Sequence, residues 1–208
     1  MNKRVKKILV IISIFLLCGC MNNEINVNSI DHNISYIISN ASKYQNTSGK
    51  GFKFYKPRDF SVLENNDFNL ILLHNSVKYY LNIDINAYHN SALEMIDESG
   101  DQKYFTAFKY NGLDGYLLVK ERNDSYFYVK MVYNYSCIEV VVREEAVNDA
   151  IVDSAIILSS IKYNDSVIDS LINTDEFASK EKTYEIKKPK EENRKNILDV
   201  YQYDTYNE

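Results

Sequence analysis

The chain has 208 residues and a net charge of −5 at pH 7, with 24 lysine and arginine residues against 29 aspartate and glutamate residues. This acidic balance argues against nucleic acid as a partner, because binding to a phosphate backbone requires a basic surface. The length is sufficient for one domain with a substantial hydrophobic core and is short for two.

Residues 1–19 have the composition of a secretory signal peptide. Four basic residues come first, an apolar stretch occupies positions 8–17, and Leu17-Cys18-Gly19-Cys20 follows. The apolar stretch is about half of the roughly 20 residues that a membrane-spanning helix needs, so we do not expect it to act as an anchor helix. Removal of this segment lowers the net charge from −5 to −9, because it contains four basic and no acidic residues.

Leu17-Cys18-Gly19-Cys20 resembles the lipobox of bacterial lipoproteins, in which a leucine stands three positions before the modified cysteine and a small residue directly precedes it. The resemblance implies that the signal is removed and that Cys20 carries a diacylglyceryl thioether with fatty acids such as palmitate. Two acyl chains hold a protein stably on a membrane, whereas one is marginal. The resemblance therefore implies a lipid anchor on the extracytoplasmic face of the bacterial cell membrane. The alternative is an ordinary cleaved signal with Cys20 as a stray thiol.

The three cysteines of the sequence favour a domain without disulfides. Cys18 leaves with the signal and Cys20 is acylated, so Cys137 remains as the single thiol. A secreted domain of this kind must be stabilised by its hydrophobic core.

The region before residue 57 predicts a tether, a helix, a loop and a strand. Residues 20–28 are rich in asparagine and predict a short tether. Isoleucines at helical spacing predict an amphipathic helix over 29–43. Serine, asparagine and glycine predict a loop over 44–51, and an alternating strand follows until Pro57, which cannot donate to a ladder.

Two further strands are predicted over 69–74 and 77–88. Strict alternation in the second strand indicates that one face is buried and the other is exposed. The face expected in the core carries Tyr79, Leu81, Ile83, Ile85 and Ala87, and the opposite face carries Tyr80, Asn82, Asp84, Asn86 and Tyr88. Residues 91–101 are expected to form a loop or a short helical turn.

An antiparallel meander is predicted in the second half of the chain. Its expected strands span 103–110, 113–120, 126–135 and 137–143. Asn111-Gly112 predicts a type I′ turn, and Asn123-Asp124 marks the next reversal. Short connections of this kind join antiparallel neighbours.

The hydrophobic period changes after Arg143 from two residues to nearly four. Val147, Ile151, Ala155 and Leu158 form a stripe that predicts a second amphipathic helix. A short edge strand is expected at 161–163 and a last helical turn at 167–172. Charged and polar residues dominate 173–208, which we expect to be mostly disordered or loosely docked.

The chain from 29 to 172 is therefore predicted to be a single α+β domain, with an antiparallel sheet of five or six strands covered by an N-terminal and a C-terminal helix. The opening Gly51-Phe-Lys-Phe-Tyr-Lys-Pro57, the meander and the closing Ala155-Ile-Ile-Leu-Ser-Ser-Ile-Lys-Tyr163 resemble the PsbP-like fold. Photosystem accessory proteins, a small Ran-binding import factor and many bacterial lipoproteins of unknown role share this fold. The resemblance covers about residues 52–163 and implies no functional residue, because the fold hosts unrelated functions.

The sequence contains no common catalytic signature, such as G-x-S-x-G, H-E-x-x-H, a P-loop or a dinucleotide fingerprint. His32, His74 and His89 fall in different predicted elements without metal-ligand spacing, so neither a metal nor another cofactor is expected. No basic cluster or helix start adjoins Cys137 in sequence to activate its thiol, and we expect this residue to be inert.

An aromatic and polar surface is the most suggestive feature of the predicted sheet. It comprises the outward residues Tyr80, Asn82, Asp84, Asn86 and Tyr88 of one strand and Tyr126 and Tyr128 of another. Tyrosines with amide neighbours suit the binding of sugars or peptides by stacking and hydrogen bonds. The alternative is ordinary sheet surface, or a face that a helix covers.

These features favour a non-enzymatic, lipid-anchored binding or accessory module of the bacterial cell envelope. It would contact the membrane through the Cys20 lipid, with an envelope protein or a cell-wall saccharide or peptide as partner. Two alternatives stay open. One is an envelope hydrolase in which the fold gathers Asp84, another carboxylate and His74 or His89, and the other is an assembly factor whose tail after Asn173 binds a partner.

Overall fold

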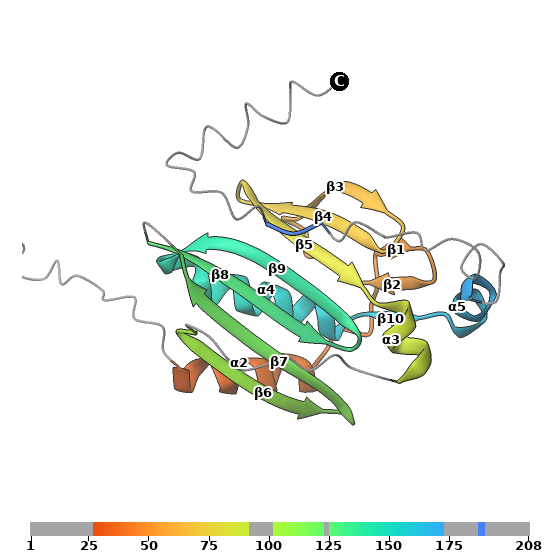
Figure 1. Cartoon of the computed structure of the whole chain (residues 1–208), viewed down its shortest axis with the longest axis horizontal. Helices are drawn as coiled ribbons and strands as arrows, with labels where there is room; N and C mark the ends of the chain where they lie inside the picture. The colour runs from red at the N-terminus through yellow and green to blue at the C-terminus, as the bar shows by residue number, and fades with distance from the viewer. Residues whose placement is uncertain (1–26, 92–101, 123–124, 173–186, 190–208) are drawn as a thin grey trace, which may run out of the picture.

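The computed structural model describes residues 27–91, 102–122, 125–172 and 187–189 (Figure 1). Its helices are α2 (Val27–Ser39), α3 (Ile85–Asn90), α4 (Val147–Ser159) and α5 (Asp165–Ile172), with a 3₁₀ turn at Glu144–Ala146. Its strands are β1 (Thr47–Gly49), β2 (Phe52–Phe54), β3 (Ser61–Asn66), β4 (Asn69–His74), β5 (Val77–Ile83), β6 (Tyr104–Tyr110), β7 (Leu113–Glu121), β8 (Tyr126–Tyr133), β9 (Ser136–Arg143) and β10 (Lys162–Tyr163).

Two meanders join to form the main antiparallel sheet. The strand order is β3-β4-β5-β9-β8-β7-β6, so β3 to β5 form one meander, β6 to β9 form the other, and β5 pairs with β9 at the seam. A separate sheet has the order β1-β2-β10. The α+β class and the antiparallel sheet are confirmed, whereas the prediction of five or six strands is wrong, because the main sheet has seven.

The extra strand of the main sheet is β3, which the hydrophobic pattern did not indicate. All six of its residues are exposed, and a register shift lies between Val62 and Glu64. An edge strand without a buried face carries no alternation of apolar and polar residues, so periodicity does not reveal it. The opening strand, predicted over 51–57, is the three-residue β2, and it belongs to the small sheet with β10.

The two long helices cover one face of the main sheet. Helix α4 packs against β8 and β9, while α2 packs against α4 and β6, and Figure 1 shows both helices behind the sheet. The core between these layers contains Leu70, Leu81, Ile138, Val140 and Met131 from the sheet and Ile34, Ile151 and Leu158 from the helices. We call the opposite side of the main sheet the outer face.

The tight turns use residues that tolerate positive φ angles. Asn111 and Gly112 have φ angles of 51° and 79°, as the predicted type I′ turn requires. Asn134 and Tyr135 make an equivalent turn between β8 and β9, with φ angles of 53° and 55°. The antiparallel pairing of β7 with β8 shows that the chain reverses between residues 121 and 126, and the predicted turn residues 123–124 lie outside the described residues.

The strand predicted over 77–88 ends at Ile83, which corrects the face assigned to its second half. Asp84 accepts a hydrogen bond from the backbone N–H of Ala87 at 2.8 Å and caps α3. A side chain that satisfies a free N–H in this way stabilises a helix start. Ile85 is buried in this helix. The alternation of apolar and polar residues therefore continues past Ile83 by coincidence, although the backbone there is helical. Asn86 and Tyr88 consequently leave the surface that Tyr80 and Asn82 share.

The remaining boundaries differ modestly from expectation. The helix predicted over 29–43 ends at Ser39, where the Asn40 amide donates to the Tyr36 carbonyl. The edge strand predicted at 161–163 exists as β10, and the last helical turn is α5. The predictions for Cys20, the tether before residue 27, residues 92–101 and most of the tail lie outside the described residues. None of the helices that the structure describes has the length and apolar composition needed to cross a bilayer.

Candidate functional site

The register of the main sheet brings distant residues into rows across the outer face. One row runs from Glu64 on β3 through Ile71 on β4, Tyr80 on β5 and Glu139 on β9 to Lys130 on β8. In the next row Asn82 lies opposite Cys137, which lies opposite Val132. Residues directly opposite one another in antiparallel strands have neighbouring side chains. The seam between β5 and β9 therefore joins both meanders in one polar cluster.

The predicted surface is partly assembled here. Tyr80 and Asn82 share the outer face with Tyr126 and Tyr128, which alternate with the inward Phe127 and Val129 along β8. Asp84, Asn86 and Tyr88 do not belong to it, because the chain turns into α3 after Ile83. Sequence reasoning missed Glu139 and Tyr116. The available signal for Glu139 was its position as the single acidic residue within the apolar run of β9.

Glu139 and Lys130 form a buried ion pair at the centre of the outer face. The Lys130 Nζ lies 3.5 Å from Glu139 Oε1, and the two side chains are 22% and 3% exposed, respectively. Glu139 Oε2 and Asn82 Oδ1 are buried and have no hydrogen-bond partner within the part of the chain that the structure describes. Buried acceptors are costly unless a donor reaches them. The cluster is therefore suited to receive N–H or O–H donors.

The ionisable groups of the cluster favour their uncharged forms, apart from the ion pair. Burial raises the pKa of Tyr128, and the nearby Glu139 raises it further. Burial likewise raises the pKa of Tyr116 to about 12. Burial acts to lower the pKa of Lys130, but Cys137, Tyr116 and Glu139 together raise it above its ordinary value. At neutral pH the phenols are protonated and Lys130 is a cation.

Cys137 lies beside the ion pair and is held as a thiol. Its Sγ is 3.9 Å from Glu139 Oε1, to which it donates. Burial is the main cause that raises its pKa from 9.0 to about 12, and Glu139 adds to the effect, whereas Lys130 and Lys188 act to lower it. Because the thiolate is the nucleophilic form, this environment disfavours reaction at Cys137.

We expect Cys137 to react with iodoacetamide at pH 8 about a hundredfold or more slowly in the folded protein than in the unfolded chain, because three pKa units remove about a thousandfold of thiolate. A full-length Cys18→Ser, Cys20→Ser variant has Cys137 as its only thiol. Mass spectrometry of timed samples, with and without guanidinium chloride, measures both rates. Equal rates in the two conditions would contradict the raised pKa of Cys137.

The residues of the hydrolase alternative lie in separate places. His74 Nδ1 is 3.2 Å from Asp153 Oδ2, which also accepts from the Tyr79 hydroxyl at 3.1 Å, at the start of β5. Asp84 caps α3 at the other end of that strand, roughly 20 Å away at about 3.4 Å per residue. His89 Nδ1 pairs with Asp169 Oδ1 at 3.4 Å on the exposed surface. Asp84 and His74 therefore share no cleft.

Tyr88 has a packing role away from the outer face. Its ring stacks on Tyr163 with a centroid distance of 4.0 Å and meets Tyr135 edge-on at 5.6 Å. Its hydroxyl donates to Asp165 Oδ1 at 2.5 Å, which is the main cause that raises its pKa to about 12. These contacts connect α3 and the β8–β9 turn to β10 and α5.

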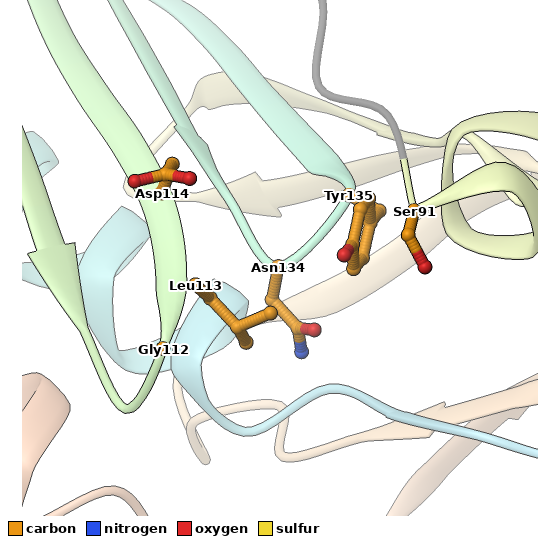
Figure 2. Close-up of a pocket in the computed structure, with 6 residues that line it drawn as sticks. All are labelled: Ser91, Gly112, Leu113, Asp114, Asn134 and Tyr135. Atoms are coloured by element: carbon orange, nitrogen blue, oxygen red, sulfur yellow. The ribbon is translucent and has the colours of Figure 1, made fainter.

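Two hollows on the described surface lie outside this cluster. One has a volume of about 60 Å³, room for about two water molecules, and is lined by Ser91, Gly112, Leu113, Asp114, Asn134 and Tyr135. In Figure 2, Leu113 and Asn134 lie close together while Asp114 points away from them. The other, of about 310 Å³, lies between α2 and the edge strand β6, where the Tyr104 hydroxyl donates to Asp31 at 2.7 Å. Within the described ranges, no three or more histidine, cysteine and acidic side chains gather as a metal site would require.

Comparison with protein family models and with curated proteins found no match for this chain.

Proposed function

We propose that this chain is a lipid-anchored binding or accessory module of the bacterial cell envelope. Cys20 holds it on the extracytoplasmic face of the cell membrane, and the outer face of its main sheet contacts an envelope protein or a cell-wall saccharide or peptide. The sequence Leu17-Cys18-Gly19-Cys20 supports the anchor. We also propose that the domain has the PsbP-like fold, which the antiparallel sheet with both long helices on one face supports.

The observation that carries the binding function is the buried Glu139 with an unpartnered oxygen. A carboxylate that is 3% exposed is unfavourable unless its acceptors are used, and Lys130 contacts only one of its two oxygens. The unpartnered Asn82 Oδ1 lies in the neighbouring row of the same face. A ligand that brings donors to these two acceptors relieves the cost of burying them.

The protonation states of the cluster support binding in preference to catalysis. A general base must be unprotonated near the working pH in order to accept a proton, and an effective nucleophile must be deprotonated. The raised pKa values of Tyr128, Tyr116 and Cys137 keep these groups neutral, and that of Lys130 keeps it cationic. Neutral phenols next to a fixed charge pair are suited to hydrogen bonding and stacking.

The anchor is tested by replacing Cys20 with alanine in cells grown with labelled palmitate. We expect the label to be lost completely, because the thioether and the new N-terminus on Cys20 carry the acyl chains. Cys137→Ala is the matched control, since it removes the other cysteine outside the signal and is expected to keep the label. Incorporation of labelled palmitate into the Cys20→Ala protein would overturn the proposal that Cys20 carries the lipid anchor.

The binding face is tested by photocrosslinking on intact cells. A benzophenone amino acid replaces Tyr128 on the outer face or, as the control, Tyr36, which is exposed on α2. We expect position 128 to give a discrete adduct with an envelope component and position 36 to give none. Identical adducts from both positions, or an adduct from position 36 alone, would argue against the outer face as the binding surface.

A further inference from the structure

A short segment from the tail of the chain lies against the outer face. Lys187 Nζ forms an ion pair with Glu64 Oε2 on β3, and Pro189 is buried. Lys188 is exposed, and its charge acts to lower the pKa of Cys137 on β9. Figure 1 shows the segment, in blue, in front of β4 and β5, while α4 lies behind the sheet. We call Lys187–Pro189 the strap.

The strap acts on residues on both sides of the seam of the sheet. Glu64 and Cys137 belong to β3 and β9, which are three strand positions apart, or roughly 14 Å at the spacing of about 4.8 Å. The strap thus contacts the first meander through Glu64, and the charge of Lys188 acts on a residue of the second.

We propose that the outer face is a binding site for an extended segment of lysine and proline, and that the strap of this same chain is its resident occupant. The inference rests on the proposed binding function and deepens it, because it gives the partner a chemical class. An envelope protein that presents an extended basic segment with proline would exchange with the strap.

The acceptors of the outer face match this chemistry. A lysine ammonium has three donors and no acceptor. With the strap in place Lys187 contacts the Glu64 carboxylate, whereas Glu139 Oε2 and Asn82 Oδ1 keep no partner among the described residues and are available to a further donor. A neutral saccharide would bring hydroxyls but no cation, and would leave the negative charge of Glu64 without a partner.

The apolar part of the face also matches the strap. Ile71, Tyr116, Leu118 and Val132 are buried, yet they lie outside the core that the helices cover. Proline has no N–H group, so its burial leaves no unsatisfied donor. The tyrosine rings of the face add surfaces on which a proline ring or a lysine ammonium packs favourably.

The covalent connection to α5 gives the strap an advantage over a free segment. A covalently joined segment reaches effective concentrations on the order of 1 mM. A partner segment therefore displaces the strap only when it binds more tightly or is itself concentrated at the membrane. Occupation of the face by the strap would keep the module closed until such a partner is present.

The labelling rate of Cys137 reports on the strap. In the full-length Cys18→Ser, Cys20→Ser background, we expect Lys187→Glu with Lys188→Glu to accelerate iodoacetamide labelling about tenfold, the factor that loss of one charge-assisted contact gives. Electrostatics alone would slow labelling in this variant, because Lys188 acts to lower the pKa of Cys137 and a glutamate there would raise it. The matched control is Lys53→Glu with Lys162→Glu, an equal charge change on the exposed small sheet.

A charge exchange separates release of the strap from loss of the fold. Glu64→Lys alone should accelerate labelling, because it repels Lys187, and adding Lys187→Glu to it should restore the slow rate. Both side chains are partly exposed, so neither change disturbs the core. Unchanged labelling rates in the Lys187→Glu, Lys188→Glu variant and in Glu64→Lys would overturn the proposal that the strap occupies the outer face. A fast rate in the variant that combines Glu64→Lys with Lys187→Glu would overturn it as well.

Added peptide tests whether the face accepts the same chemistry from another molecule. We expect the peptide Glu-Ile-Lys-Lys-Pro-Lys, the sequence of residues 185–190, to slow labelling of the double lysine variant at about 10 mM, above the effective concentration of the tether. The control peptide has glutamate at each lysine. Protection by a cell-wall disaccharide-peptide but not by the lysine peptide would overturn the assignment. The background lacks Cys20, so this outcome is independent of the lipid anchor.

Discussion

Replacing Lys130 with methionine is expected to lower the free energy of unfolding by about 3 to 5 kcal/mol, the cost of leaving one member of a buried ion pair alone. Glu139 would then be a carboxylate that is 3% exposed, with neither oxygen contacted by a cation from the sheet. Methionine retains much of the length and apolar volume of the lysine stem. The loss therefore reports on the charge more than on packing.

The reciprocal variant should cost less. Glu139→Leu leaves Lys130, which is 22% exposed and has a flexible stem that carries its ammonium to water. We expect a loss of about 1 to 3 kcal/mol for this variant. Lys130→Met combined with Glu139→Leu should be close to the wild type, because an apolar pair replaces buried ion pairs at little or no cost.

Urea unfolding at pH 7 of the two single variants and the double variant provides the coupling energy of the pair. A Lys130→Met protein as stable as the wild type would show that Glu139 is compensated by something other than Lys130. A double variant less stable than both single variants would show that the pair is required for reasons other than charge.

Leu81→Ala is expected to destabilise the protein by about 2 to 5 kcal/mol, through lost transfer energy and the cavity left behind. Leu81 is 0% exposed and lies in β5 at the seam, between Leu70 of β4 and Ile138 of β9. Both neighbours belong to the same core under the helices. A close-packed site of this kind has little room to collapse around the missing atoms.

Leu63→Ala is the matched control, because the same chemical change is made at a residue that is 46% exposed on the edge strand β3. We expect its effect to stay within about 0.5 kcal/mol, as for most surface substitutions. Thermal and urea unfolding of both variants give the comparison. Similar losses at positions 63 and 81 would contradict the assignment of β3 to the exposed edge and β5 to the core.

The residues of the ion pair lie on the same face of the sheet as the strap, so their substitution should also affect the labelling of Cys137. Lys130 and Glu139 lie in the same row as Tyr80 and Glu64, so the face that holds the ion pair also holds the strap. Changes at Lys130 should consequently alter both the stability of the sheet and the protection of Cys137. Changes at Leu81 act on the opposite face and should affect stability alone.

Local pattern predicted several elements of the fold closely. β4 has the bounds expected from its apolar run, and the Asn111-Gly112 turn has the predicted positive φ angles. The stripe of α4 is buried as expected. Such elements depend on interactions between residues near in sequence, which hydrophobic periodicity and turn chemistry describe directly.

The same reasoning failed where local pattern was ambiguous. Ile85 and Ala87 extended the alternation of β5, but Asp84 caps a helix there, and a single capping side chain leaves no periodic trace. β3 lacks a buried face, and β2 and β10 are too short for a pattern to emerge. Their pairing depends on partners more than one hundred residues apart in the case of β2 and β10.

The sequence by itself determined the α+β class, the faces of the main strands and the four-residue pattern, similar to a lipobox, on which the proposed anchor rests. Tertiary structure decided which residues on those faces become neighbours. A period of two assigns a side chain to one face of a strand, whereas the row in which it lies depends on long-range register. Only the pairing of β5 with β9 places Tyr80 and Asn82 beside Glu139 and Cys137. Only the return of the strap from the far end of the chain brings Lys187 to Glu64, because that contact joins residues 123 positions apart.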